Sequence, residues 1–253
     1  MTSYDEDAGS TLLHKTSKNG KVTYLNIMLE AKLVTPEGFC LSLASEPLTN
    51  EEIVEYEKQD CEISALKRLA KKLKSLYPRL PICILADALY ANQSMFSICS
   101  ANEWKFIITF KDGQLKSLQT EITDTAESAR IHFEKHILSN KQQNLYKTQS
   151  YRAIEALPYN DFTLNWIECI ESSPLPVVEQ TEKRAASTSA KFVYLTNISL
   201  GEITDLKQDR IVKLVKAGRC RWEIENEGFQ HPKKNQGYQL HHKFCPKLCK
   251  NAP

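Results

Sequence analysis

The sequence predicts an α/β fold in which a mixed β-sheet is flanked by helices. A hairpin signal precedes a helix of regular apolar period, two short apolar runs each follow a helix, and a long helical pattern comes last. The chain of 253 residues is long enough to bury a core, either as one large domain or as a domain that carries an insertion.

Composition and cysteine content exclude several other classes of protein. Hydrophobic residues make up 42% and charged residues 25%, which is typical of a globular chain and excludes collagen-like and disordered sequences. No apolar run approaches the roughly 20 residues that span a bilayer, and the start at Met1–Gly9 is acidic rather than signal-like. We therefore expect a cytoplasmic protein with no membrane partner and with reduced cysteines.

Two features near the C-terminus bear on ligands. Between Asp205 and Pro253 the chain has eleven Lys or Arg against five Asp or Glu, which favours contact with a polyanion but also fits a solvated, lysine-rich helix. The only cysteine grouping that resembles zinc ligands has a spacing that matches no common zinc finger. It consists of His241, His242, Cys245 and Cys249.

The first elements of the predicted sheet form a hairpin. Residues 1–20 are polar and without period, and we expect a disordered lead-in there. Val22–Val34 and Phe39–Ala44 are strand-like runs on either side of the turn signal Pro36–Gly38, which predicts two antiparallel strands.

A helix, a strand, a second helix and a second strand follow the hairpin. A helix with one buried face is predicted from apolar residues at spacings of three and four, namely Ile63, Leu66, Leu69, Leu73 and Leu76. Ile82–Ala86 is a short continuous apolar run, which is typical of a strand buried on both faces. Tyr90–Glu103 then predicts a helix, and Phe106–Phe110 predicts another buried strand.

The pattern changes between residues 114 and 188, where longer polar stretches alternate with strand-like pieces. Asn144–Ile154 and Phe162–Ile170 are the strand-like pieces, so we interpret the region as an inserted, partly β subdomain. Phe192–Leu195 resumes an apolar strand, and a helical pattern runs from Asp205 to about Phe229.

The last predicted helix carries one glutamate on its apolar face. On a wheel of about 100° per residue, Glu225 falls about 40° from the axis through Ile211. The other residues of that face are Val215, Gly218, Trp222 and Phe229. An unpaired carboxylate there would be costly, so either Arg221, four residues before Glu225, neutralises it or the carboxylate faces a metal ion.

Asp87 is the natural second ligand if a metal ion is bound. It ends the apolar run Ile82–Ala86, and open α/β sheets place their sites at the carboxyl ends of such strands. The alternative is that Asp87 caps a turn or a helix, which is a frequent role for an aspartate at a strand end. Periodicity alone does not bring Asp87 and Glu225 into contact.

Several ordered motifs resemble the DDE transposases of bacterial insertion sequences. The final stretch is similar to the catalytic glutamate helix of that family, and two earlier stretches are similar to the segments around its second aspartate. The resemblance extends over about Lys15–Phe244. Its motifs are Lys58–Glu62, Leu85–Asn92, Arg219–Phe229, Asn235–Tyr238 and Leu240–His241.

The resemblance implies a ribonuclease-H-like fold with a β-rich insertion before the last catalytic helix. Residues 21–113 and 189–244 would form the catalytic core, residues 114–188 the insertion, and residues 245–253 a divergent tail. It also implies metal-dependent cleavage and strand transfer on double-stranded DNA at transposon ends, with Asp87 and Glu225 as catalytic and metal-binding residues. Hard oxygen ligands suit Mg²⁺ or Mn²⁺. A nucleoid-associated protein that can form a homodimer would be expected.

Many members of the family also carry a signature of tyrosine, arginine, glutamate and lysine on the glutamate helix, and these residues contact DNA near the cleaved bond. Arg221 stands at its arginine position, while Gly218 occupies the tyrosine position. Pro232 occupies the lysine position, with Lys233 and Lys234 beside it as candidate phosphate contacts. The resemblance therefore implies DNA binding by Arg221, Lys233 and Lys234.

The first catalytic aspartate of the family has no counterpart in the pattern. It would stand on a strand just before Val22, but Asp5 and Asp7 lie in a polar region without an apolar run. We therefore expect an N-terminally truncated and inactive transposase, with a DNA-binding or protein-interaction module derived from a transposase as the alternative.

Overall fold

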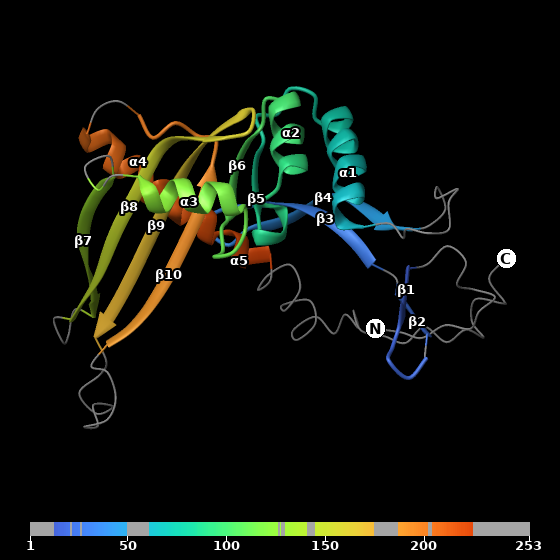
Figure 1. Cartoon of the computed structure of the whole chain (residues 1–253), viewed down its shortest axis with the longest axis horizontal. Coiled ribbons are helices and arrows are strands. Elements are labelled where there is room, and N and C mark those ends of the chain that lie inside the picture. Colours follow the sequence, from blue (N-terminus) through green and yellow to red (C-terminus); the bar gives the residue numbers. More distant parts are fainter. Residues whose placement is uncertain are drawn as a thin grey trace. The chain divides into compact units, whose positions relative to one another are not determined.

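The computed structural model describes residues 13–20, 22–25, 27–49, 61–125, 127, 130–140, 145–174, 187–201 and 204–224 (Figure 1). The chain divides into two compact units. One contains residues 1–80 and 222–253, and the other contains residues 81–221.

The first unit begins with two antiparallel strand pairs. β1 (Leu13–Thr16) pairs with β2 (Val22–Leu25), and β3 (Ile27–Val34) pairs with β4 (Cys40–Leu48). The second pair confirms the predicted hairpin, but the predicted run Val22–Val34 is divided between β2 and β3. The hairpin turn contains Gly38 at a φ of +88°, a conformation that suits glycine.

The prediction of a disordered lead-in over residues 1–20 is wrong for Leu13–Thr16. Gly20, at a φ of +76°, donates its N–H to the Ser17 carbonyl at 3.0 Å, so a tight turn folds β1 back onto β2. Leu13 is buried, which gives this short strand an apolar anchor. Asp5 and Asp7 lie outside the described residues.

Helix α1 (Glu62–Leu76) confirms the predicted amphipathic helix and packs on β4. Its buried residues are Ala65, Leu66, Leu69, Ala70 and Leu73. Arg68 Nε donates to Glu46 at 2.7 Å, and Lys72 Nζ donates to the Ser45 carbonyl at 2.9 Å. Polar contacts therefore hold β4 against α1, in addition to the burial of the apolar face of α1.

The second unit is built on one six-stranded mixed sheet in the order β5-β6-β10-β9-β8-β7. Only β5 and β6 are parallel, and the other neighbours are antiparallel. The strands are β5 (Cys83–Ala86), β6 (Lys105–Thr109), β7 (Ile131–Asn140), β8 (Leu145–Tyr159), β9 (Phe162–Pro174) and β10 (Ser187–Thr196). The α/β class with a mixed sheet is thereby confirmed.

The strands of the predicted insertion continue this sheet. β7, β8 and β9 all fall between residues 114 and 188, and β9 pairs along its length with β10. β10 in turn pairs with β6. Hydrogen bonding is therefore continuous from the predicted core into the predicted insertion.

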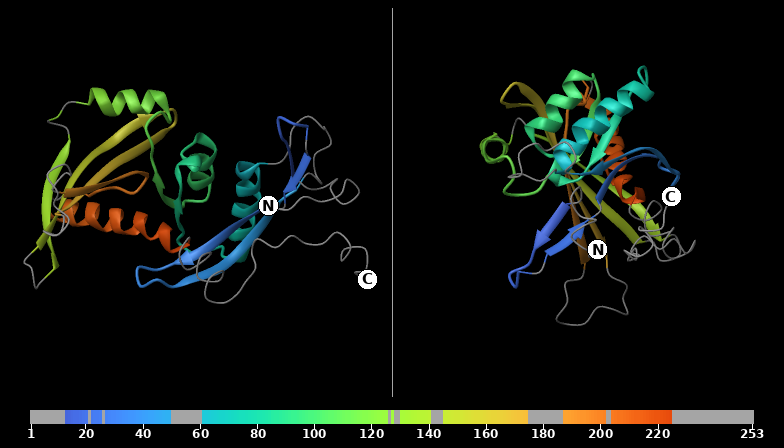
Figure 2. Two further views of the ribbon diagram at one scale, coloured as in Figure 1. Left: turned by 90° about the horizontal axis from the view of Figure 1, so that it is seen from below. Right: turned by 90° about the vertical axis from the view of Figure 1, so that its right-hand side faces the viewer.

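Helices cover both faces of the sheet, and α3 (Lys116–Asp124) and α4 (Thr204–Arg219) lie on opposite sides (Figure 2). On the α4 side, Ile211 and Val215 pack with Tyr151 and Ile167 in one apolar cluster. Helix α2 (Gln93–Ala101) contributes Phe96, whose ring stacks on a side chain of β6 at 5.3 Å between centroids.

Two predictions, one of a helix boundary and one of the burial of a strand, need correction. The helix predicted from Asp205 to about Phe229 is not continuous, because α4 ends at Arg219 and a turn at Cys220 precedes the short α5 (Arg221–Glu223). Strand β5 is not buried on both faces, because Cys83 is exposed and the other three residues are only partly buried.

Candidate functional site

Asp87 stands at the carboxyl end of β5, as the sequence predicts. One carboxylate oxygen, Oδ1, accepts the backbone N–H of Leu89 at 2.9 Å, so Asp87 caps the short 3₁₀ turn η2 (Ala88–Tyr90). The residue is exposed. The capping alternative is therefore correct for Oδ1, and it leaves a charged, accessible carboxylate at the edge of the sheet.

Of the other predicted site residues, only Arg221 belongs to the described part of the chain. Glu225, Lys233 and Lys234 lie outside the described residues, so their distance from Asp87 is not defined. Arg221 begins α5 and is partly exposed. Within the described part of the chain, no three His, Cys, Asp or Glu side chains come together as a metal-binding group.

Helix α4 presents a row of cations on its solvent side. Arg210, Lys213 and Lys216 recur every three residues, and all three are exposed. Arg210 Nη1 donates to the Ser199 carbonyl at 3.1 Å, which fixes that side chain near the start of the helix. The row gives a surface on which phosphates can be bound without burying any charge.

Gly218, at the tyrosine position of the transposase signature, lies directly against the ring of Tyr194 on β10. A Cβ at Gly218 would stand 2.7 Å from Cε1 and Cζ of that ring. Burial raises the pKa of Tyr194 to about 12, so its hydroxyl stays protonated. The helix and the sheet therefore meet at a point where only glycine fits.

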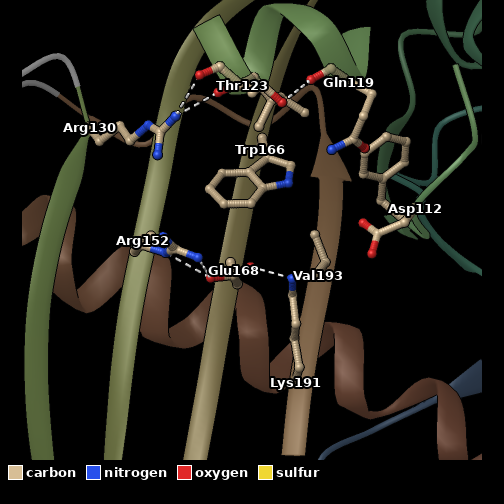
Figure 3. Close-up of a pocket in the computed structure, with 11 residues that line it drawn as sticks. Asp112, Gln119, Thr123, Arg130, Arg152, Trp166, Glu168, Lys191 and Val193 are labelled. Atoms are coloured by element: carbon tan, nitrogen blue, oxygen red, sulfur yellow. Dashed lines mark hydrogen bonds and ion pairs between the residues drawn. The ribbon is translucent and has the colours of Figure 1, made fainter. Parts of the chain in front are cut away.

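Two buried glutamates on β9 were not predicted from the sequence, and the first is Glu168. Its carboxylate accepts hydrogen bonds from Arg152 Nε at 2.7 Å and Nη2, and pairs with Lys191 Nζ at 2.9 Å (Figure 3). Burial raises the pKa of Glu168, but the hydrogen bonds and charges of Lys191 and Arg152 outweigh it and lower the pKa. The carboxylate is therefore ionised near neutral pH.

The second is Glu171, on the opposite face of β9. It accepts from Lys147 Nζ at 2.9 Å, Gln149 Nε2 at 2.8 Å and Arg219 Nη1 at 3.1 Å. Burial opposes ionisation, but these donors and charges lower the pKa of Glu171 to about 2. Arg219 also lies 4.7 Å above the centre of the Phe192 ring, so the last residue of α4 is held to the sheet by two contacts.

The cysteines of the described residues are thiols, and no disulfide joins any two of them. Burial raises the pKa of Cys99 to about 12 and that of Cys169 to about 11, so both stay protonated. His241, His242, Cys245 and Cys249 lie outside the described residues. No helix in the described part has both the length and the apolar character needed to cross a bilayer.

Comparison with known proteins adds no further identification. No protein-family model matches the sequence, and no curated protein is significantly similar to it.

Proposed function

We propose that this chain contains the catalytic region of a DDE-type DNA transposase with a ribonuclease-H-like core. The observation that carries the proposal is the position of Asp87. It directly follows β5, the first of two parallel strands in a mixed sheet, and the α4 helix precedes Glu225 later in the chain, as in that family.

The proposed chemistry is cleavage and transfer of DNA phosphodiester bonds. Asp87 and Glu225 would hold Mg²⁺ or Mn²⁺, because carboxylates are the hard oxygen ligands that these ions prefer. The ions would activate water or a DNA 3′-hydroxyl and stabilise the leaving oxygen. Arg221, Lys233 and Lys234 would contact phosphates near the reacting bond.

A third acid is required for full activity in this proposal. None of the described strands before α1 contains an aspartate, although that is where the family's first catalytic residue would stand. Losing one of three ligands weakens two-metal chemistry severely. The second candidate function is therefore DNA binding without cleavage, and the exposed cations of α4 favour it.

The catalytic proposal is tested with Asp87→Asn in a Mg²⁺-dependent DNA nicking assay. Asparagine caps turns and helix starts about as well as aspartate, so the variant keeps the bond from Leu89 but loses the carboxylate charge. Any nicking that the wild-type chain retains without the third acid should be lost in Asp87→Asn and in Glu225→Gln. Asp161→Asn, at an exposed turn before β9, is the matched control and should nick normally.

Nicking that survives in Asp87→Asn would reject the assigned site. A wild-type chain that binds DNA without cutting it would reject catalysis and leave the DNA-binding candidate. If the chain neither cuts nor binds DNA, both candidates fail.

DNA binding through α4 is expected to depend on salt in a way that reports its lysines. The double variant Lys213→Gln/Lys216→Gln should bind more weakly, and the slope of log K against log salt should flatten by about two, because each phosphate contact contributes about 0.9. Fluorescence anisotropy with a labelled duplex measures both quantities.

The matched control removes two charges from another exposed helix surface, with Lys67→Gln and Lys71→Gln on α1. It should leave the slope unchanged if α4 is the contact surface. Equal flattening in the two double variants would mean that α4 has no special role and that only net charge matters.

A further inference from the structure

Strand β7 (Ile131–Asn140) is the outer strand of the six-stranded sheet (Figure 1). Among the residues that the structure describes, β7 pairs with β8 and with no other strand. The backbone N–H and C=O groups along its outer edge therefore form a template on which a further strand can pair. With ten residues, β7 is longer than the usual strand of about five or six residues, so this edge is long.

Strand β7 lacks the features that usually prevent pairing at the edge of a sheet. Such features are a very short strand, a proline, or an unneutralised lysine. β7 contains no proline, and its one lysine, Lys135, forms an ion pair with Asp209 of α4 at 3.0 Å. The bulge in its pairing with β8 lies between Leu138 and Asn140, so the segment Ile131–Ile137 is regular.

The face of β7 that lies toward α4 is apolar on both sides of Lys135. Ile131 and Phe133 pack against the apolar cluster that includes residues of α4, and the Phe133 ring stacks on Tyr151 at 4.8 Å between centroids. Ile137 is on the same face, because side chains alternate along a strand, and it is 43% exposed. This face therefore has one apolar side chain held in place and one left open to solvent.

The other face of β7 carries an acid and a base two residues apart. Glu134 and His136 are both exposed. His136 Nδ1 lies 3.2 Å from Thr148 Oγ1 on β8, which orients the imidazole and allows Nε2 to bond a group on another strand. A strand that pairs with β7 can therefore match its charge as well as its backbone.

A second copy of β7 supplies that match in one register. When two identical strands pair antiparallel about a two-fold axis, one residue lies opposite its own copy, and directly opposed side chains share a face. With Lys135 opposite its own copy, Glu134 lies opposite His136, and Phe133 lies opposite Ile137. The axis makes each of these two contacts occur twice.

The neighbouring registers are less favourable. A shift that places Glu134 opposite its own copy opposes two carboxylates and sets Phe133 against Lys135. The shift in the other direction places His136 opposite its own copy and sets Lys135 against the apolar Ile137. Like charges that lie directly opposite are destabilising, whereas unlike charges and apolar pairs stabilise the sheet.

We propose that two copies of this chain associate through antiparallel pairing of their β7 edges, with Lys135 opposite its own copy. The ion pair with Asp209 reduces the repulsion between the two central lysines. Association ends at the dimer, because each copy uses the same edge and the two-fold axis closes the contact. The interface does not depend on the proposed transposase activity.

Sedimentation equilibrium of the full chain tests whether the dimer forms. We expect a monomer–dimer equilibrium with a dissociation constant on the order of 100 µM, in the weak range that suits an interface made mainly by one strand. A chain that remains monomeric at about 500 µM would overturn the proposal.

Charge exchange tests which residues face each other. Glu134→Lys places two cations opposite one another and His136→Glu places two carboxylates opposite one another, so each variant should weaken dimerisation about tenfold. The double variant Glu134→Lys/His136→Glu exchanges the two partners and should restore the wild-type dissociation constant to within about threefold. Glu121→Lys, at an exposed position of α3, makes the same change of charge and should dimerise normally.

Urea unfolding at about 1 µM, where the chain is monomeric, checks that each variant folds. A dimer that persists in both single variants, or that the double variant does not restore, would reject the β7 interface.

An introduced thiol tests the register independently. Directly opposed residues of antiparallel strands have Cα atoms about 4.5–5.5 Å apart, within the range that a disulfide can join. Under mild oxidation Lys135→Cys should therefore form a disulfide between the two copies of position 135, identified by mass spectrometry of non-reduced peptides. The wild-type chain, with its exposed Cys61 and Cys83, gives the background. Joining of the two copies in Glu134→Cys or His136→Cys, but not in Lys135→Cys, would contradict the proposed register.

Discussion

Replacing Gly218 with alanine is expected to lower the free energy of unfolding by about 1–3 kcal/mol, although alanine is the better helix former. The new methyl group would lie 2.7 Å from two atoms of the Tyr194 ring. That ring is 4% exposed and belongs to the cluster with Ile107, Ile167 and Ile211, so it cannot swing away. The overpacking cost exceeds the helix-propensity gain of at most about 1 kcal/mol.

A double-mutant cycle with Tyr194→Leu distinguishes a clash from a general helix effect, measured by urea unfolding. Tyr194→Leu removes the ring atoms, so adding Gly218→Ala to it should be neutral or stabilising. If Gly218→Ala costs the same free energy in both backgrounds, the contact with Tyr194 is not the cause.

The same contact bears on the transposase resemblance. A tyrosine at position 218 would place a whole ring where one methyl group already overlaps Tyr194. We expect Gly218→Tyr to lose more stability than Gly218→Ala. The tyrosine of the family signature is therefore incompatible with this helix-to-sheet packing, and any DNA contact must come from other residues.

Local patterns were sufficient to predict most of the elements. The Pro36–Gly38 turn and the alternating runs beside it gave the β3–β4 hairpin, and spacings of three and four gave α1. Short apolar runs gave β5 and β6 within one residue at each end. These elements bury residues that are close in sequence, so composition and period report them directly.

Two elements of the second unit were missed for different reasons. Helix α3 has only two buried residues, Leu118 and Ile122, and such a weak apolar stripe is hard to separate from a polar loop. Strand β7 did carry a signal, since Ile131 and Phe133 alternate with exposed His132 and Glu134. The charged residues around Ile131 and Phe133 obscured this alternation of apolar and exposed polar residues.

The inward face predicted for the last helix is correct within α4, which ends at Arg219, and wrong for Trp222 beyond it. Ile211, Val215 and Gly218 are buried as the wheel requires, but Trp222 is 51% exposed. The Cys220 N–H donates to both the Lys216 and Ala217 carbonyls, which marks a tightened last turn at the end of α4. A wheel drawn straight through that turn does not describe Trp222, and Glu225 lies outside the described residues.

The buried carboxylates found on β9 depend on partners that no local pattern reveals. Glu171 is ionised because Lys147, Gln149 and Arg219 converge on it from β8 and α4. These partners are 22 to 48 residues away in sequence. Only strand register and helix docking bring them together, so the sequence alone could not show which glutamates are buried.

Glu171 is expected to make the stability of the chain sensitive to acid. Its pKa is about 2 in the folded protein against an ordinary value of 4.5. The folded state therefore holds this carboxyl ionised more strongly than the unfolded state does. The resulting stabilisation is complete above about pH 4.5 and is lost progressively as the pH falls toward 2.

The comparison of wild type with Glu171→Gln isolates this contribution. At one pKa unit per 1.36 kcal/mol, the wild type should lose at most about 2 kcal/mol more than Glu171→Gln between pH 5 and pH 3, since Lys147 and Arg219 remain partly exposed to solvent. Urea unfolding at a series of pH values measures the difference. Glu134→Gln, at an exposed position of β7, controls for the loss of a surface carboxyl. Stability curves that run parallel for the wild type and Glu171→Gln would mean that the buried network does not hold Glu171 ionised.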